Sequence, residues 1–316
     1  MKKNWLLLMI IPVVTHAQWT TKIKEVDSAL SYLYQHQLFN GTVLIAEKGE
    51  PIYKKAFGIA GSSKQPLTTA SAFNLASVSK QFFSMMVMML KESGKLQYDD
   101  PVQKHLPSFP YPNITIRHLL NHTSGLVEYF ELADRYRSLL DTLNNASMLA
   151  LLAKCAPALE FTPGEKFVYC NTNYTTLASV IEKLSGMPCE QFLQQRIAIP
   201  LKLKNTYIYH LGMPSYPVSR VFGFHYEKGQ PVADDLVWLD GIVGDGNVYS
   251  SAEDLLLWDQ ALYTGKLVKQ STFKEAITAG VLNDGRQTKY GFGWFIEKPG
   301  EETDHTGGWV AFRTYI

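Results

Sequence analysis

Ser77 and Lys80 are the residues whose types and spacing most directly suggest chemistry. They precede an apolar run, 82–90, that predicts a buried helix, and positions i and i+3 of a helix lie on one face. The hydroxyl and the amine can therefore meet. A serine hydroxyl becomes a nucleophile when a base takes its proton, and burial can lower a lysine pKa from about 10.4 far enough for that role. Backbone N–H groups at the helix start would suit a developing oxyanion.

A second stretch, around Tyr169 and Asn171, could supply partners for this pair. It lies between a Pro-Gly turn and a predicted helix. A tyrosine coupled to a lysine can act as a general base, and the asparagine amide can hold a substrate carbonyl or the lysine. On its own, each signal is weak. Ser-x-x-Lys more often marks a helix N-cap beside a solvated lysine, and Tyr169 could be an ordinary packed loop residue.

A third stretch, His305-Thr306-Gly307-Gly308, lies near the end of the sequence. A strand with small residues lets a substrate backbone approach closely. The Gly308 N–H could also complete an oxyanion hole with the Ser77 N–H. An ordinary Gly-Gly hairpin with an exposed histidine could have the same sequence, so this stretch alone is equally weak evidence for an active site.

The elements that would position these residues follow from apolar periodicity and turn residues. We expect helices over about residues 20–37, 77–92, 115–120, 146–152, 174–184, 192–197 and 252–263. We expect a hairpin over 41–58, a strand over 290–296, and two strands joined by a Gly-Gly turn over 303–316. The methionines within 85–89 are expected to fill the core rather than bind a metal.

Length and composition narrow the possible classes of function further. The chain has 316 residues, 46% of them hydrophobic, and a net charge of +1. It can bury a large core, and its charge gives no electrostatic case for binding nucleic acid. Residues 1–17 combine two lysines, an apolar stretch and a Thr-His-Ala end, which indicates a signal peptide and export to the periplasm or medium without a stable membrane anchor. The cysteines Cys155, Cys170 and Cys189 could form one disulfide or remain free thiols.

The order and spacing of the three stretches resemble those of the serine β-lactamase and penicillin-binding-protein superfamily. The chain looks closest to the class C β-lactamase-like branch, which includes DD-carboxypeptidases, D-aminopeptidases and esterases. The stretches that carry the likeness include 73–82, 94–96, 99–102, 114–126, 163–165, 169–174 and 290–294. The likeness covers about residues 25–316.

This resemblance implies an α/β (α+β) fold of the β-lactamase/transpeptidase type, in which helices flank an antiparallel sheet. The α/β part would comprise about 20–100 and 245–316, and an α-rich part about 101–244 would be inserted between them, all within one domain, 18–316.

The resemblance also implies roles for the candidate residues. Ser77 would be the acyl-accepting nucleophile, Lys80 its proton partner and Tyr169 the general base of a coupled pair. The same likeness implies substrate binding by Asn171, His305, Thr306 and Gly307, with the side chain of His305 facing the substrate. The Ser77 and Gly308 amides would form the oxyanion hole. The substrate would be a small molecule or peptide, including peptidoglycan fragments and β-lactams, and no metal or cofactor would be required.

Two features depart from the family pattern. Position 305 is histidine where β-lactamases carry lysine, and a histidine with a pKa near 6.5 is mostly neutral at pH 7. We therefore expect poor β-lactam hydrolysis. The family also places a further strand and a C-terminal helix after this region, so the sequence ending at Ile316 is expected to lack both.

Two other classes of function remain open at this point. A non-catalytic module that binds penicillin or senses cell-wall fragments could keep all three motifs, and a scaffold protein could keep the fold alone. His122, His225 and Asp245 receive no role from the sequence. The oligomeric state is also left open.

Overall fold

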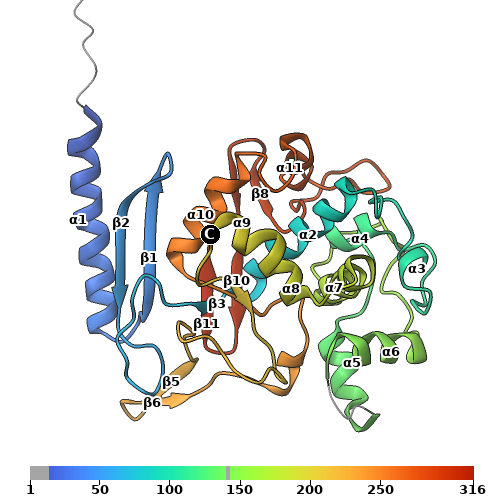
Figure 1. Ribbon diagram of the computed structural model, residues 1–316, viewed down its shortest axis with the longest axis horizontal. Helices are drawn as coiled ribbons and strands as arrows, with labels where there is room; N and C mark the ends of the chain where they lie inside the picture. Colours follow the sequence, from blue (N-terminus) through green and yellow to red (C-terminus); the bar gives the residue numbers. More distant parts are fainter. Residues whose placement is uncertain (1–13, 140–142) are drawn as a thin grey trace, which may run out of the picture.

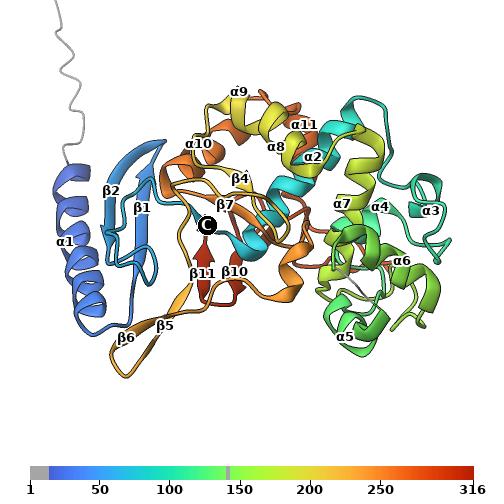
Figure 2. The same ribbon diagram turned by 60° about the horizontal axis from the view of Figure 1, so that its bottom comes forward.

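The computed structural model describes residues 14–139 and 143–316. Strands from both ends of the chain lie on one side of the molecule, and helices from its middle lie on the other (Figures 1 and 2). Within the described ranges, no helix is both long enough and apolar enough to cross a bilayer. The predicted signal peptide, residues 1–17, falls mainly on residues outside the description and stays a prediction.

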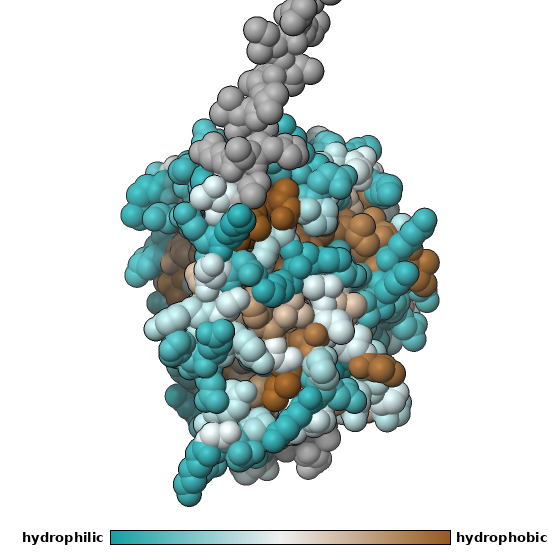
Figure 3. Space-filling model, turned by 90° about the vertical axis from the view of Figure 1, so that its left-hand side faces the viewer, coloured by the Kyte–Doolittle hydropathy of each residue, from teal (hydrophilic) through white to brown (hydrophobic). Residues whose placement is uncertain are grey.

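The first elements are helix α1 (Val14–Gln35) and the hairpin of β1 (Gly41–Glu47) and β2 (Glu50–Phe57). The helix lies along β2 (Figure 1), where Asp27 accepts hydrogen bonds from the Tyr53 hydroxyl at 2.8 Å and from Lys55 at 2.6 Å. The outer face on this side is mostly hydrophilic with separate apolar patches (Figure 3). The predicted helix and hairpin are confirmed.

The centre of the molecule is a 3-10 turn, η1 (Ala76–Ser79), which continues into helix α2 (Lys80–Glu92). The side chains of α2 are buried nearly all round, as the continuous apolar run predicts. Phe82 stacks on Trp258 with ring centroids 4.2 Å apart. Gly94, with φ 74°, ends the segment in the left-handed conformation that glycine tolerates.

Helices dominate the middle of the chain. They are α3 (Val102–His105), α4 (Ile116–Leu120), α5 (Tyr129–Arg135), η2 (Arg137–Leu139), α6 (Asn145–Cys155), α7 (Asn171–Ser185), α8 (Cys189–Leu193), the π-helical turn η3 (Gln194–Ala198) and α9 (Ile199–Leu201). Helix α7 packs against α2 and α4. The span that follows, up to residue 244, contains short strands as well, so it is not purely helical.

Each ladder between named strands is antiparallel. Strands β3 (Phe73–Asn74), β7 (Val248–Ser250) and β4 (Tyr207–Ile208) form one sheet in the order β3-β7-β4. The remaining pairs are β5 (Phe224–Glu227) with β6 (Gln230–Ala233), β8 (Phe295–Lys298) with β9 (Glu302–Asp304), and β10 (Thr306–Trp309) with β11 (Phe312–Tyr315). The other helices are η4 (Trp238–Gly241), α10 (Ala252–Leu262) and α11 (Gln270–Ala276). The predicted mixed α/β architecture with antiparallel strands is confirmed.

Two predictions of local structure are wrong. The strand predicted over 290–296 begins only at Phe295. Gly307 and Gly308 lie inside β10, and the turn falls at 310–311 instead. A Cβ on Gly307 would collide with the Leu75 carbonyl and the Thr314 hydroxyl. Glycine is therefore required there for the close approach of β10 to η1 rather than for a turn.

Candidate active site

Ser77 sits at a point where several elements hold the backbone from different sides. Ala76 has φ 47°, in the left-handed region, and its N–H donates to Asn74 Oδ1 at 2.9 Å. The Thr314 hydroxyl on β11 donates to the Leu75 carbonyl at 2.7 Å. A non-glycine residue in this conformation persists only where its surroundings impose it. The fold thus fixes the orientation of the serine before any substrate binds.

The Lys80 amine lies beside the Ser77 hydroxyl, as the spacing predicts. Its Nζ donates to Ser77 Oγ at 3.0 Å, to Asn171 Oδ1 at 2.9 Å and to the Asp245 backbone carbonyl at 2.8 Å. The side chain is fully buried, and burial lowers the pKa of Lys80 to about 8, although the Asp245 and Glu128 carboxylates oppose the shift. A lysine with this pKa is partly neutral near pH 7 and can accept the serine proton.

Asn171 connects the lysine to a carboxylate that the sequence did not single out. Its backbone N–H and its Nδ2 both donate to Glu128 Oε2, at 2.9 and 3.1 Å. Burial raises the pKa of Glu128 to about 6. The amide is therefore held with its oxygen toward Lys80 and its nitrogen toward Glu128. Of the two roles considered for Asn171, the structure shows contact with the lysine.

Tyr169 packs against the same lysine through its ring. Lys80 Nζ lies 4.9 Å from the ring centroid, and the ring also stacks on His122 with centroids 4.2 Å apart. Among the described residues, the buried Tyr169 hydroxyl has no aligned hydrogen-bond partner. Burial raises the pKa of Tyr169 well above 10, although the neighbouring Ser77 hydroxyl opposes the shift. The tyrosine thus keeps its proton at neutral pH in the free protein, and its role as general base stays a prediction.

The prediction that His305 faces the substrate does not agree with its position. Its side chain is 1% exposed, with Nδ1 2.6 Å from the Thr306 carbonyl and Nε2 2.9 Å from the Tyr290 hydroxyl. These partners correspond to a neutral ring that donates from Nδ1 and accepts at Nε2. Burial, together with the charge of Lys80, lowers the pKa of His305 to about 3. The imidazole is therefore a buried support of the strand.

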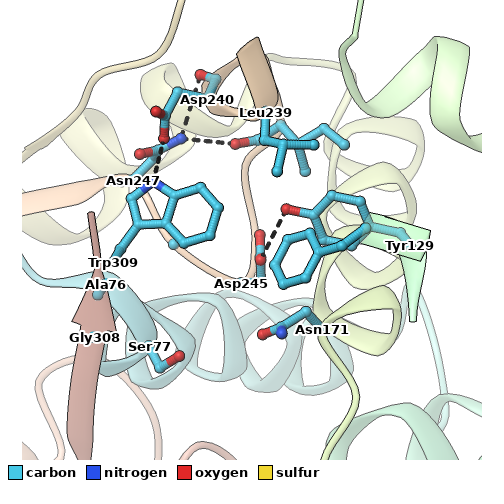
Figure 4. A pocket seen from close by; sticks show the side chains of 13 residues that line it. Ala76, Ser77, Tyr129, Asn171, Leu239, Asp240, Asp245, Asn247, Gly308 and Trp309 are labelled. Carbon is cyan, nitrogen blue, oxygen red and sulfur yellow. Dashed lines mark hydrogen bonds between the residues drawn. The ribbon is translucent and has the colours of Figure 1, made fainter. Parts of the chain in front are cut away.

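A cavity of about 200 Å³ opens next to Ser77. Asn171 and Gly308 also line it, whereas His305, Thr306 and Gly307 do not. Thr306 is exposed and Gly307 is buried against η1. Figure 4 shows Ser77 and Gly308 on one side of the cavity and Asn171 opposite. This placement is compatible with an oxyanion hole made by the Ser77 and Gly308 amides, which stays a prediction.

Comparison with known proteins identifies the family of the chain. The protein-family model for β-lactamases matches residues 20–316. The chain belongs to the β-lactamase family. Penicillin-binding protein 4* of Bacillus subtilis is 37% identical over 314 residues, which are 93% of this chain and 68% of that relative. D-aminopeptidase of Brucella anthropi is 25% identical over 285 residues, 86% of this chain and 53% of that relative.

A solved structure of a hydrolase has a similar fold. EstCE1, described as a hydrolase with promiscuous acyltransferase activity, superposes with a TM-score of 0.72 and 27% identity, over 88% of this chain and 83% of the other. The chain spans about two thirds of the penicillin-binding protein and about half of the D-aminopeptidase. This β-lactamase-family chain therefore has serine hydrolases of the penicillin-binding-protein superfamily as relatives, as the sequence motifs predict.

Sequence reasoning missed several groups around this β-lactamase-family site. Tyr129 and Trp309 line the cavity, as does Asp245, to which the sequence assigned no role. The only signal for Asp245 was its position in a Gly-Asp-Gly-Asn turn between two apolar segments. All three cysteines are free thiols. Among the described residues, no group of three or more His, Cys, Asp or Glu side chains could hold a metal ion.

Proposed function

We propose that the chain is an exported serine hydrolase that forms an acyl-enzyme on Ser77 and cleaves amide or ester bonds. The observation that carries this proposal is the 3.0 Å contact between Lys80 Nζ and Ser77 Oγ, made by a fully buried lysine whose pKa is lowered to about 8. A nucleophile within hydrogen-bond reach of a base of matched pKa is the arrangement that covalent catalysis requires.

The proposed reaction has two steps. Neutral Lys80 accepts the hydroxyl proton while Ser77 Oγ attacks the carbonyl carbon, and the Ser77 and Gly308 amides stabilise the oxyanion. The tetrahedral intermediate collapses, and the departing amine or alcohol takes a proton from Lys80 directly or through Tyr169. A water molecule then loses a proton to neutral Lys80 and attacks the ester carbon. As the ester bond breaks, Ser77 Oγ takes that proton back from Lys80 and the acid is released. Lys80 is the better candidate for the first proton acceptor, because the pKa of Tyr169 lies well above 10.

The names of the relatives support the reaction class without fixing the substrate. They include a penicillin-binding protein, a D-aminopeptidase and an acyltransferring hydrolase. We assign the chain to the class C-like branch on its Tyr-x-Asn and His-Thr-Gly motifs. We expect weak hydrolysis of β-lactams, because His305 is buried and neutral where a cation would bind the β-lactam carboxylate.

A substrate panel tests this proposal. Nitrocefin, p-nitrophenyl esters, D-Ala-D-Ala peptides and D-amino-acid anilides would be offered to the wild type, to Ser77→Ala and to the exposed-serine control Ser62→Ala. We expect turnover of an ester or amide that only Ser77→Ala abolishes. Stable labelling of Ser77 without turnover would favour the non-catalytic sensor instead, and turnover retained in Ser77→Ala would refute the proposal. Export is tested by fusing residues 1–17 to a reporter.

A further inference from the structure

Aromatic rings form one wall of the cavity beside Ser77. Tyr129 and Phe130 follow each other at the start of α5, with ring centroids 4.3 Å apart, and Phe130 stacks on Trp309 of β10 at 5.5 Å. All three residues line the cavity. The faces of aromatic rings carry partial negative charge and attract cations, so such walls are used by proteins to bind ammonium groups.

A carboxylate adjoins this aromatic wall. Asp245 lines the cavity, and Figure 4 shows its carboxyl group between Tyr129 and the side on which Ser77 lies. Its Oδ2 accepts a hydrogen bond from the Tyr129 hydroxyl at 3.2 Å. Lys80 binds the backbone carbonyl of Asp245, at 2.8 Å, rather than its carboxylate. The carboxyl group also accepts hydrogen bonds from the Asp245 and Gly246 N–H groups, and burial raises its pKa, although the charge of Lys80 opposes the shift. An ammonium group in the cavity would stabilise its ionised form.

The charges around the cavity are mainly acidic. Asp240 also lines it, with its carboxylate bonded to Trp309 Nε1 at 2.7 Å and to the Val237 N–H at 2.6 Å. Glu128 lies behind Asn171. Apart from Lys80 underneath, the described residues bring no cation to the cavity wall. Arg313, the cross-strand neighbour of Gly308, is exposed and donates to backbone carbonyls of its own turn.

We propose that Asp245 is a specificity residue that, with the rings of Tyr129, Phe130 and Trp309, binds an ammonium group in the acyl part of the substrate. The preferred substrates would then be amides or esters of amino acids with a free amine rather than acids with a free carboxylate. This inference rests on the proposed serine hydrolase function, because it places the ammonium group close to the carbonyl that Ser77 attacks. A partly desolvated carboxylate and the faces of aromatic rings stabilise a bound cation and destabilise a bound anion in this part of the cavity.

Matched substrate pairs test the substrate assignment. In each pair a methyl group replaces the ammonium group: D-alanine against isobutyric p-nitroanilide, and β-alanine against butyric p-nitroanilide, with the corresponding methyl esters as a second set. We expect the wild type to prefer the ammonium member at least about tenfold in kcat/KM, and Asp245→Asn to reduce that ratio at least about tenfold. Phe130→Leu should reduce it about two- to fivefold.

The ratio of kcat/KM values within each substrate pair distinguishes recognition of the ammonium group from a general effect on the active site. If Asp245 acted only through Lys80, Asp245→Asn would slow both members of a pair equally and leave the ratio unchanged, which would overturn the proposal. Asp134→Asn removes an exposed carboxylate from the same helix as Tyr129 and should leave the ratio at the wild-type value. A wild-type ratio near one in both pairs would likewise overturn it.

A binding measurement tests the ammonium site independently of catalysis. Calorimetric titration of Ser77→Ala with propylammonium and with propionate needs no turnover. We expect propylammonium to bind at least about tenfold more tightly, and the double variant Ser77→Ala/Asp245→Asn to lose this preference. Absence of any acylation together with this preference would refute the hydrolase and keep the ammonium site. Acylation without the preference would refute the ammonium site alone.

Discussion

The pH dependence of Ser77 acylation should follow the protonation of Lys80. With a pKa of about 8, Lys80 is neutral in about one tenth of the molecules at pH 7 and in about half at pH 8. The base form is the deprotonated lysine, so the acylation rate should rise about fivefold from pH 7 to pH 8 and level off above about pH 9. A solvated lysine, with a pKa near 10.5, would give a rate that still climbs at pH 10.

Replacing Glu128 by glutamine should shift this profile to lower pH. The Glu128 charge raises the pKa of Lys80, and glutamine removes the charge while keeping an oxygen that can accept from the Asn171 N–H groups. Loss of one neighbouring charge shifts a buried pKa by about one unit. The neutral fraction of Lys80 at pH 7 would then rise to about one half, and Glu128→Gln should react about fivefold faster than the wild type at that pH.

The assay is the second-order rate of phosphonylation by a fluorophosphonate between pH 5.5 and 10. Glu131→Gln, an exposed change of the same charge on α5, is the control and should leave the midpoint unchanged. Glutamine also loses the oxygen that accepts from the Tyr129 N–H, at a cost of about 1 kcal/mol in unfolding free energy, so all variants are compared well below their melting temperatures. A midpoint that stays in place or moves upward in Glu128→Gln would refute the assignment of Lys80 as the base.

Three further predictions concern the residues around this pair. Asn171→Ala removes an acceptor of the Lys80 amine, and it should lower kcat/KM about 10- to 1,000-fold while leaving the melting temperature within a few degrees; an unchanged kcat/KM would contradict this role. Gly307→Ala places a Cβ against Leu75 and Thr314 and should lower the unfolding free energy by about 1–3 kcal/mol in urea titrations, whereas Gly308→Ala, whose Cβ would lie 3.7 Å from Arg313 Cδ, should fold normally. The pKa of His305 is about 3 in the folded protein, so between pH 6.5 and pH 3 only the unfolded chain binds a proton at this residue. The unfolding free energy should therefore fall by up to about 1.4 kcal/mol for each unit that the pH is lowered in this range, and His305→Asn should flatten this slope.

The sequence predicts the elements that have strong local signals. The continuous apolar run after Ser77 predicts a buried helix, and the structure places α2 there. The β-branched run at 41–46 and the turn at 48–50 likewise predict the β1–β2 hairpin. Strands β3 and β4 have two residues each, which is too short for alternation of side chains to be detected. Their positions depend on tertiary packing alone.

The active site likewise contains contacts that local sequence spacing predicts and contacts that depend on tertiary packing. The Ser77–Lys80 contact follows from helix geometry, because three residues separate the two along one face. Glu128 lies 43 residues before Asn171, and the two meet only because the segment 126–128 is hydrogen-bonded to the start of α7. The burial of His305 was missed because the glycines after it carry no side chains, so β10 has no alternating pattern to show which face points inward.

Trapping of the acyl-enzyme tests whether Ser77 is the nucleophile. The wild type, Ser77→Ala and Ser62→Ala would be treated with a fluorophosphonate and with penicillin, and intact mass followed by peptide sequencing would locate any adduct. We expect one adduct per chain, on Ser77, in the wild type and in Ser62→Ala, and none in Ser77→Ala. An adduct of equal yield in Ser77→Ala, or no adduct with either reagent on the folded wild type, would show that Ser77 is not the nucleophile.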